Sequence, residues 1–407
     1  MLSQLHKAYK AYQLKNCIIA NDWSECHKII EILKSIDYLD TPDNENNTFL
    51  MLVCMIEYKD KNNKIEAEKI ALKLLETKIS NPNHVNTIRK ATALIYACKN
   101  KMEKVALELI RTGESNPDYY STYGYGGTAL IEACKNNMNE VALEIVKTGK
   151  SNPKHIDFYM DTALIYACNN KMEEVALELI RTGESNPNQV NYCKETALII
   201  ACKNKMEKTA LELIQTGESI PNHVNKCGHT ALIIACVNGM ERTALELIQT
   251  GKSNPNHATP TGFTALIIAC TNGMERTALE LIQTGKSNPN NVSSNGNTAL
   301  IHACINKMEK VAIEIIDTGE SNFKHVNKKD YTASTYAYKN NLINVIRELN
   351  ILKKGGYDLY YARKNNINIE NEYIEVSAAK LDMDSNNHIL NAKEINAELA
   401  ESAESYN

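Results

Sequence analysis

The stretch that decides the fold is TALIIACVNGMERTALELIQTGKSNPN, residues 230–256. Residues 264–290 repeat it with one substitution, since Thr271 stands where Val237 stood. A fixed period of 20 to 50 residues indicates a solenoid or a related repeat architecture. The T-A-L start recurs every 34 residues, after a first step of 36, at Thr92, Thr128, Thr162, Thr196, Thr230, Thr264 and Thr298.

Each copy predicts two short helices followed by a loop. Thr230 precedes an apolar segment, and a threonine hydroxyl at that place can accept a hydrogen bond from a free N–H group at a helix start. An Asn-Gly pair then interrupts the segment, and residues 241–250 carry apolar side chains at the spacing of a second amphipathic helix. Gly251 stands where a left-handed helix end is expected. The Gly, Pro and Asn residues up to position 263 predict an extended loop.

A 34-residue period also fits tetratricopeptide repeats, so the period leaves two architectures open. Tetratricopeptide units consist almost entirely of two longer helices. The long loop in every copy instead favours a unit built from a turn and two short helices. We therefore predict an all-α solenoid in which neighbouring helix pairs stack on one another.

The repeats resemble the ankyrin repeat, and the pattern returns in phase over residues 48–350. The resemblance implies stacked helix-turn-helix units with β-hairpin-like finger loops. Ala and Ile replace the family's Pro and His after Thr, which removes a side-chain tie between repeats, and each period has one extra residue. The Asn-rich repeats are similar to those of ankyrin proteins of large DNA viruses and AT-rich protists. The residues that carry the resemblance are GHTALIIACVNG at 228–239, then Ala244, Leu247-Ile248, Gly251 and N-P-N at 254–256.

The repeat pattern and its ends predict five segments. A single repeat cannot bury its own apolar face, so the terminal units need modified outer sides. Within residues 1–40 we expect two helices, capped at Asp22 or Ser24, whose apolar face contains Trp23, Ile29, Ile30, Ile32 and Leu33. The segments are an N-terminal helical cap at 1–47, a degenerate repeat at 48–91, seven regular repeats at 92–331, a C-terminal capping repeat at 332–355, and an acidic, weakly helical or disordered tail at 356–407.

The net charge of −4 is unevenly distributed. Residues 356–407 hold ten acidic and four basic side chains, so the rest of the chain is close to neutral. A near-neutral body argues against nucleic-acid binding, which needs a basic face. The N-terminus shows no apolar core of signal-peptide length, and no apolar run approaches the length of a membrane span. We therefore expect a cytoplasmic protein that does not enter membranes.

Eight of the twelve cysteines occupy one slot of the repeat. Helices of neighbouring copies pack about 8 to 10 Å apart, beyond the Cα separation of about 7 Å that a disulfide tolerates. We interpret these cysteines as small buried hydrophobes, which suits a reducing compartment. They are Cys54, Cys98, Cys134, Cys168, Cys202, Cys236, Cys270 and Cys304.

Histidines share another slot, just after the N-P-N motif. A row of imidazoles can bind metal, but Tyr119, Gln189 and Asn291 interrupt it, so a turn-stabilising hydrogen bond at the finger base is the favoured interpretation. The sequence also has no Walker A, G-x-S-x-G or H-E-x-x-H motif. We predict no metal, no cofactor and no enzymatic activity. The histidines are His84, His155, His223, His257 and His325.

The finger tips vary most between copies. Such variation is expected when helices carry the stacking and tips carry recognition, although drift at exposed tips would look similar. Aromatic residues fall on three successive fingers, and stacking would gather them into one partner-binding patch. An alternative is that some rings pack on the neighbouring finger. The predicted aromatic residues are Tyr119, Tyr120, Tyr123, Tyr125, Phe158, Tyr159 and Tyr192.

The resemblance also implies that the residue pair after each Ala-Cys lines a concave groove. We therefore predict a Tyr-rich, weakly basic surface in the N-terminal half, fitted to a protein segment that is extended or acidic. The nearly identical repeats from 230 to 290 would act as a spacer. The pairs are Lys99-Asn100, Lys135-Asn136, Asn169-Asn170 and Lys203-Asn204, with Lys99, Lys135 and Lys203 as binding residues.

The sequence thus predicts a monomeric, non-catalytic scaffold or adaptor that binds a partner protein. The similarity of its Asn-rich repeats to those of viral or protist ankyrin proteins suggests a host-interaction role. An alternative is a recruiting subunit of an enzyme complex, such as a ubiquitin ligase, that acts through the terminal segments. An enzyme hidden in those segments would need clustered His, Cys or carboxylate residues. Only Cys17, Cys26 and His27 come close.

Overall fold

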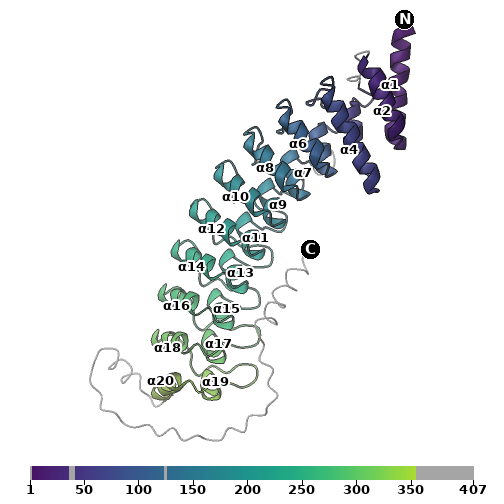
Figure 1. Ribbon diagram of the computed structural model, residues 1–407. Coiled ribbons are helices and arrows are strands. Elements are labelled where there is room, and N and C mark those ends of the chain that lie inside the picture. Colours follow the sequence, from purple (N-terminus) through teal and green to yellow (C-terminus); the bar gives the residue numbers. More distant parts are fainter. Residues whose placement is uncertain (1, 36–41, 123–125, 354–407) are drawn as a thin grey trace. The chain divides into compact units, whose positions relative to one another are not determined.

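A computed structural model describes residues 2–35, 42–122 and 126–353 (Figure 1). Within these residues the regular structure is helical, apart from two isolated β-bridges at the finger bases, Tyr120–Thr128 and Ala258–Thr264. The chain falls into two compact units, one ending at Ser219 and the other beginning at Ile220. The all-α repeat architecture predicted from the sequence is confirmed.

The N-terminal cap consists of α1 (Leu2–Ala20) and α2 (Trp23–Ser35), which pack on each other. The backbone N–H of Glu25 donates to Asp22 Oδ1 over 3.2 Å, so Asp22 is the cap of α2. The predicted apolar face is buried at Trp23, Ile29, Ile30 and Leu33. The prediction is wrong at Ile32, which is 37% exposed because it lies on the outer side of α2.

Ten helices of the first unit that follow the cap form five pairs in two layers. The first helices of successive pairs pack on one another, and so do the second helices (Figure 1). Each repeat therefore adds one helix to each layer and buries the apolar face of its predecessor. The pairs are α3 (Phe49–Met55) with α4 (Lys61–Glu76), α5 (Ala93–Lys99) with α6 (Glu103–Arg111), α7 (Ala129–Lys135) with α8 (Asn139–Lys147), α9 (Ala163–Asn169) with α10 (Glu173–Arg181), and α11 (Ala197–Lys203) with α12 (Glu207–Gln215).

Over its described residues, 220–353, the second unit has the same two-layer construction in four pairs. The last described helix ends at Lys353, and the predicted tail at 356–407 lies outside the described residues. The predicted segment boundaries stay a prediction. The pairs are α13 (Ala231–Val237) with α14 (Glu241–Gln249), α15 (Ala265–Thr271) with α16 (Glu275–Gln283), α17 (Ala299–Ile305) with α18 (Glu309–Asp317), and α19 (Ala333–Lys339) with α20 (Ile343–Lys353).

Side-chain caps and left-handed residues set the helix ends. Thr230 Oγ1 accepts a hydrogen bond from the N–H of Ile233, which satisfies one free donor at the start of α13. The turn between the two helices needs a left-handed residue, and Gly239 supplies it with a φ of 66°. Gly251, with a φ of 65°, ends the second helix in the same conformation. These ends match the positions expected from the sequence.

The eight cysteines of the shared slot are all buried in the first-helix layer. Burial disfavours the charged thiolate, and it raises the pKa of Cys168, Cys202 and Cys304 to about 12. A thiol without thiolate character is a poor nucleophile. These side chains therefore act as small core residues.

Asparagine side chains tie each repeat to the one before it. The Nδ2 of Asn170 donates to the carbonyl oxygen of Cys134 over 2.8 Å, and Asn306 bonds Cys270 in the same way over 2.9 Å. The amides that the sequence placed in a partner-binding groove are thus used between repeats, and they supply a tie where the family's Pro and His are missing. This asparagine ladder comprises Asn100, Asn136, Asn170 and Asn204 in the first unit and Asn272, Asn306 and Asn340 in the second.

Candidate partner-binding surface

The fingers are loops that join the second helix of one repeat to the first helix of the next. A side chain at their base folds each loop into a tight turn. In the third finger (151–161), Asp157 Oδ1 accepts hydrogen bonds from the N–H groups of Tyr159, at 2.9 Å, and Asp161, at 3.0 Å. Asn191 does the same in the fourth finger (185–195). Such Asx turns leave the residues at the tip free to project outward.

Hydrogen bonds join neighbouring fingers of the first unit. The N–H of Tyr192 donates to the carbonyl oxygen of Tyr159 over 3.2 Å. His155 Nε2 donates to the carbonyl oxygen of Gly126 over 3.0 Å. The histidine slot therefore forms the predicted hydrogen bond at the finger base, and its acceptor belongs to the preceding finger. His84, His257 and His325 make equivalent bonds to Asn46, Gly228 and Gly296.

The aromatic residues predicted to bind a partner differ in exposure. Phe158 and Tyr192 occupy the same slot on the third and fourth fingers and are 72% and 69% exposed. Tyr120 is 52% exposed, and its ring packs on His155 with centroids 5.0 Å apart. Tyr119 and Tyr159 are about half as exposed as Phe158. Tyr123 and Tyr125 lie outside the described residues.

The predicted basic residues contact other side chains of the chain. Lys135 Nζ lies 5.8 Å from the ring centroid of Tyr159 and 5.7 Å from that of Tyr166. Lys203 Nζ forms an ion pair with Glu195 Oε1 at 3.2 Å. Lys99 is exposed. Because two of the three ammonium groups have intramolecular partners, the basic character expected for this face is reduced.

Carboxyl groups at the finger bases were missed by reasoning from the sequence. Asp161 and Glu195 are buried at the position just before the helix-capping threonine of their repeats. Burial, and then the charge of Asp157, raises the pKa of Asp161 to about 6. Tyr166 donates its phenol hydrogen to Asp157 Oδ2 over 2.7 Å. The only signal in the sequence was an acid in a slot that is otherwise filled by neutral side chains or His229.

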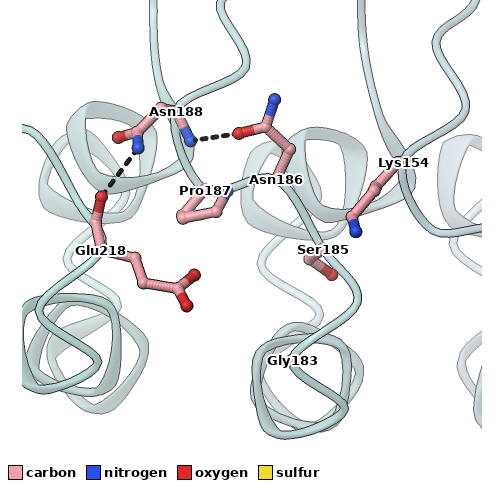
Figure 2. A pocket seen from close by; sticks show the side chains of 7 residues that line it. All are labelled: Lys154, Gly183, Ser185, Asn186, Pro187, Asn188 and Glu218. Atoms are coloured by element: carbon pink, nitrogen blue, oxygen red, sulfur yellow. Dashed lines mark hydrogen bonds between the residues drawn. The ribbon is translucent and has the colours of Figure 1, made fainter.

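A small polar cavity of about 370 Å³ lies beside the fourth finger (Figure 2). Its lining groups bond to one another, since Asn188 Nδ2 donates to the carbonyl oxygen of Glu218 over 2.7 Å and the N–H of Asn188 donates to Asn186 Oδ1 over 3.1 Å. Lys154 approaches Glu184 at 3.7 Å. None of the predicted binding residues lines this cavity.

In the part of the chain that the structure describes, no group of three or more His, Cys, Asp or Glu side chains is arranged to hold a metal ion. No helix among the described residues is both long and apolar enough to cross a bilayer.

Comparison with known protein families identifies the repeats. The family model of ankyrin repeats, in three copies, matches residues 61–157, 130–223 and 209–291. Together these segments cover more than half of the chain. A search of curated proteins with this chain found no match.

Proposed function

Because the chain belongs to the ankyrin repeat family, we propose that it binds a partner protein through the aromatic finger surface, defined as Tyr119, Tyr120, Phe158, Tyr159 and Tyr192. Ankyrin repeats generally mediate protein–protein interaction, and proteins of this family are typically non-catalytic scaffolds. The proposal assigns that general role to particular residues of the first unit.

The observation that carries the proposal is the exposure of Phe158 and Tyr192 on adjacent fingers. Two large rings with little burial are costly to leave in water, and contiguous exposed apolar area often marks an interaction site. The hydrogen bond between Tyr192 and Tyr159 holds the two tips together, so little entropy would be lost on binding. Aromatic side chains of this kind dominate binding energy at protein interfaces.

The neighbouring first-helix face offers a polar border to this surface. Lys99 is exposed there, whereas Lys135 and Lys203 are held by Tyr159 and Glu195. We propose that Lys99 contacts the rim of the partner, and that Lys135 and Lys203 mainly position the fingers. The partner segment would then be recognised by apolar contact more than by an acidic charge.

The test is affinity capture with quantitative mass spectrometry, followed by titration of each captured protein against purified chain. We expect Phe158→Ala/Tyr192→Ala to weaken binding at least about 30-fold, because an aromatic hot spot contributes about 2 kcal/mol or more. Helicity and thermal unfolding should stay unchanged, because both side chains are exposed.

The matched control is Lys226→Ala/Ser294→Ala, which changes the same finger slot in other repeats. It should leave binding intact. If both double variants bind every partner as the wild type does, the aromatic finger surface is not the binding site.

The alternative role, recruitment to an enzyme complex such as a ubiquitin ligase, depends on the terminal segments. Residues 354–407 lie outside the described part of the chain, and no observation favours this role. A chain ending at Lys353 that loses its partners while the Phe158→Ala/Tyr192→Ala variant keeps them would establish it. The cytoplasmic location, the monomeric state and a host-interaction role like that of viral or protist ankyrin proteins stay predictions.

A further inference from the structure

The outer side of α1 is an exposed helix face that carries no Lys, Arg, Asp or Glu. Helix α1 packs on α2 and α3 through its opposite side, where Leu14 and Ile18 are fully buried. Seven residues between positions 6 and 20 are exposed, and at 3.6 residues per turn they all fall on this one face. They comprise His6, two alanines and the four residues Tyr9, Tyr12, Asn16 and Ile19, which we call the outer α1 stripe.

Large apolar side chains dominate the outer α1 stripe. Tyr9, Tyr12 and Ile19 are 56%, 63% and 57% exposed. Helix α4 of the next pair shows the contrast, because three of its five exposed residues are charged. The outer side of a terminal unit needs to be polar if water is to cover it. A continuous apolar face at this place therefore indicates that another surface packs on it.

The spacing of the stripe identifies the kind of surface that fits. Its residues follow one another at steps of three, four and three, and in the sequence the same alternation begins at Leu2 and Leu5. Apolar residues at alternating steps of three and four form the seam along which two helices pack as a coiled coil. The occupant that matches the stripe is thus a helix with the same repeat.

The charges beside the stripe permit a second α1 helix as that occupant. Side by side in a parallel pair, Ala8 would flank Gln13 and Lys15 would flank Ala20 of the other copy, so no like charges meet. Lys15 Nζ is also held by Asp43 Oδ2 of its own chain at 2.8 Å.

Asn16 is the one polar residue of the stripe. A single asparagine at a core position is the feature that fixes the register and the number of helices in parallel coiled coils.

We propose that α1 pairs with α1 of a second copy of this chain as a short parallel coiled coil, in which the two Asn16 side chains face each other. A helix of 19 residues is about 28 Å long, so the interface is small and the dissociation constant should be on the order of micromolar. This inference goes beyond the binding role of the fingers, because it concerns a separate surface. It differs from the monomeric state expected from the sequence, and a dimer would carry two aromatic finger surfaces.

The test is analytical ultracentrifugation of the full chain over concentrations from well below to well above about 10 µM. We expect the molar mass to rise from that of one chain to that of two. A chain that stays monomeric at the highest concentration overturns the proposal.

Ile19→Lys should weaken the dimer at least about 30-fold, because it places two like charges opposite each other in the seam. The matched control is Ile343→Lys at the start of α20, since Ile343 is 66% exposed and lies outside the stripe. The control should dimerise as the wild type does. The proposal fails if Ile19→Lys dimerises normally, or if both variants lose the dimer equally.

Asn16→Val should tighten the association about tenfold and populate species larger than a dimer, because a polar core residue specifies the number of helices at a cost in stability. Asn62→Val makes the same change at an exposed position of α4 and should have no effect. An unchanged dissociation constant in Asn16→Val would place Asn16 outside the interface and overturn the proposed pairing. Circular dichroism of each variant shows whether the helices are intact.

Discussion

The fingers at 151–195 and those at 253–297 are built on the same turn but carry different tips. The first set presents Phe158 and Tyr192 to solvent, whereas the second has the exposed Pro260 and the half-buried Ser294 in the same slot. The two sets also differ in the residue that adopts the left-handed backbone conformation, two positions before the capping threonine. Met160 and Lys194 fill this position in the first set, with φ values of 63° and 55°.

Glycine fills this left-handed position in the second set, and the next finger lies against it. A Cβ atom on Gly296 would come within 2.7 Å of the backbone nitrogen of Lys328, and one on Gly262 would overlap the carbonyl group of Val292. The comparison shows that the repeat scaffold tolerates two kinds of finger. In one kind a glycine leaves room for the backbone of the next finger to approach closely, and in the other a residue with a side chain fills that position and the tip carries an aromatic ring outward.

The largest effect is expected from adding a side chain where the fingers touch. Gly262→Ala should lower the free energy of unfolding by about 2 to 4 kcal/mol, because alanine disfavours the left-handed region and its Cβ meets the carbonyl of Val292. Met160→Ala at the equivalent position should change it by less than about 0.5 kcal/mol. Chemical denaturation measures both. Equal costs would show that finger contact does not distinguish the two sets.

Opposite pH responses form the second contrast. His302 in the second unit is buried with its Nε2 unbonded, and burial lowers its pKa to about 4. Because its folded pKa is depressed, its contribution is complete above about pH 6.5 and is lost as the pH falls toward 4, by about 2 kcal/mol near pH 5. Asp161 has the opposite sign, since its pKa is raised.

His302→Ile introduces the residue found at this position in α13 and α15. We expect this variant to keep its stability between about pH 7 and pH 5, while the wild type loses about 2 kcal/mol. Thermal unfolding at several pH values provides the measurement. If His302→Ile and the wild type had the same pH profile, the protonated ring of His302 would have a hydrogen-bond acceptor in the folded chain.

A smaller effect is expected in the second-helix layer. Thr209, Thr243 and Thr277 are fully buried, and their hydroxyl groups have no hydrogen-bond partner. Thr243→Val should therefore stabilise the chain by about 1 kcal/mol, because it removes an unsatisfied polar group at nearly constant volume. The reciprocal Val175→Thr should cost about the same amount. If both changes are neutral in chemical denaturation, water reaches these hydroxyl groups.

The smallest effect concerns the turn between the two helices. Lys171 adopts a left-handed φ of 56° where Gly239 has 66°. Lys171→Gly should stabilise the chain by about 0.5 kcal/mol, since relief of the strained conformation exceeds the entropy that glycine adds to the unfolded state. Gly239→Ala should destabilise it by about 1 kcal/mol. A destabilising Lys171→Gly would indicate that the lysine side chain contributes to packing.

Much of the fold was predictable because its determinants are local. The Thr230 cap, the Gly251 helix end and the buried cysteine slot each depend on residues within one repeat. The asparagine ladder was missed because a polar residue after a helix equally fits an exposed position. Its role appears only when the register of neighbouring repeats places Asn170 against the carbonyl group of Cys134.

The candidate site was less predictable, for the same reason. The sequence identified Phe158 and Tyr192 as aromatic tip residues, and the structure places both in solvent. The ion pair of Lys203 with Glu195 and the crowding around Asp161 depend on distances that a linear pattern does not contain. Whether the aromatic finger surface binds a partner stays a prediction.

The buried cysteines also give this chain a set of built-in chemical reporters. One thiol lies in the first helix of each repeat from α3 to α17, and its reaction with an alkylating reagent requires that repeat to open. Because a stacked array can open locally without unfolding throughout, labelling rates read peptide by peptide would give a profile of opening free energy along the array. The ends and the middle of the array could thus be compared in one untagged, unmutated chain.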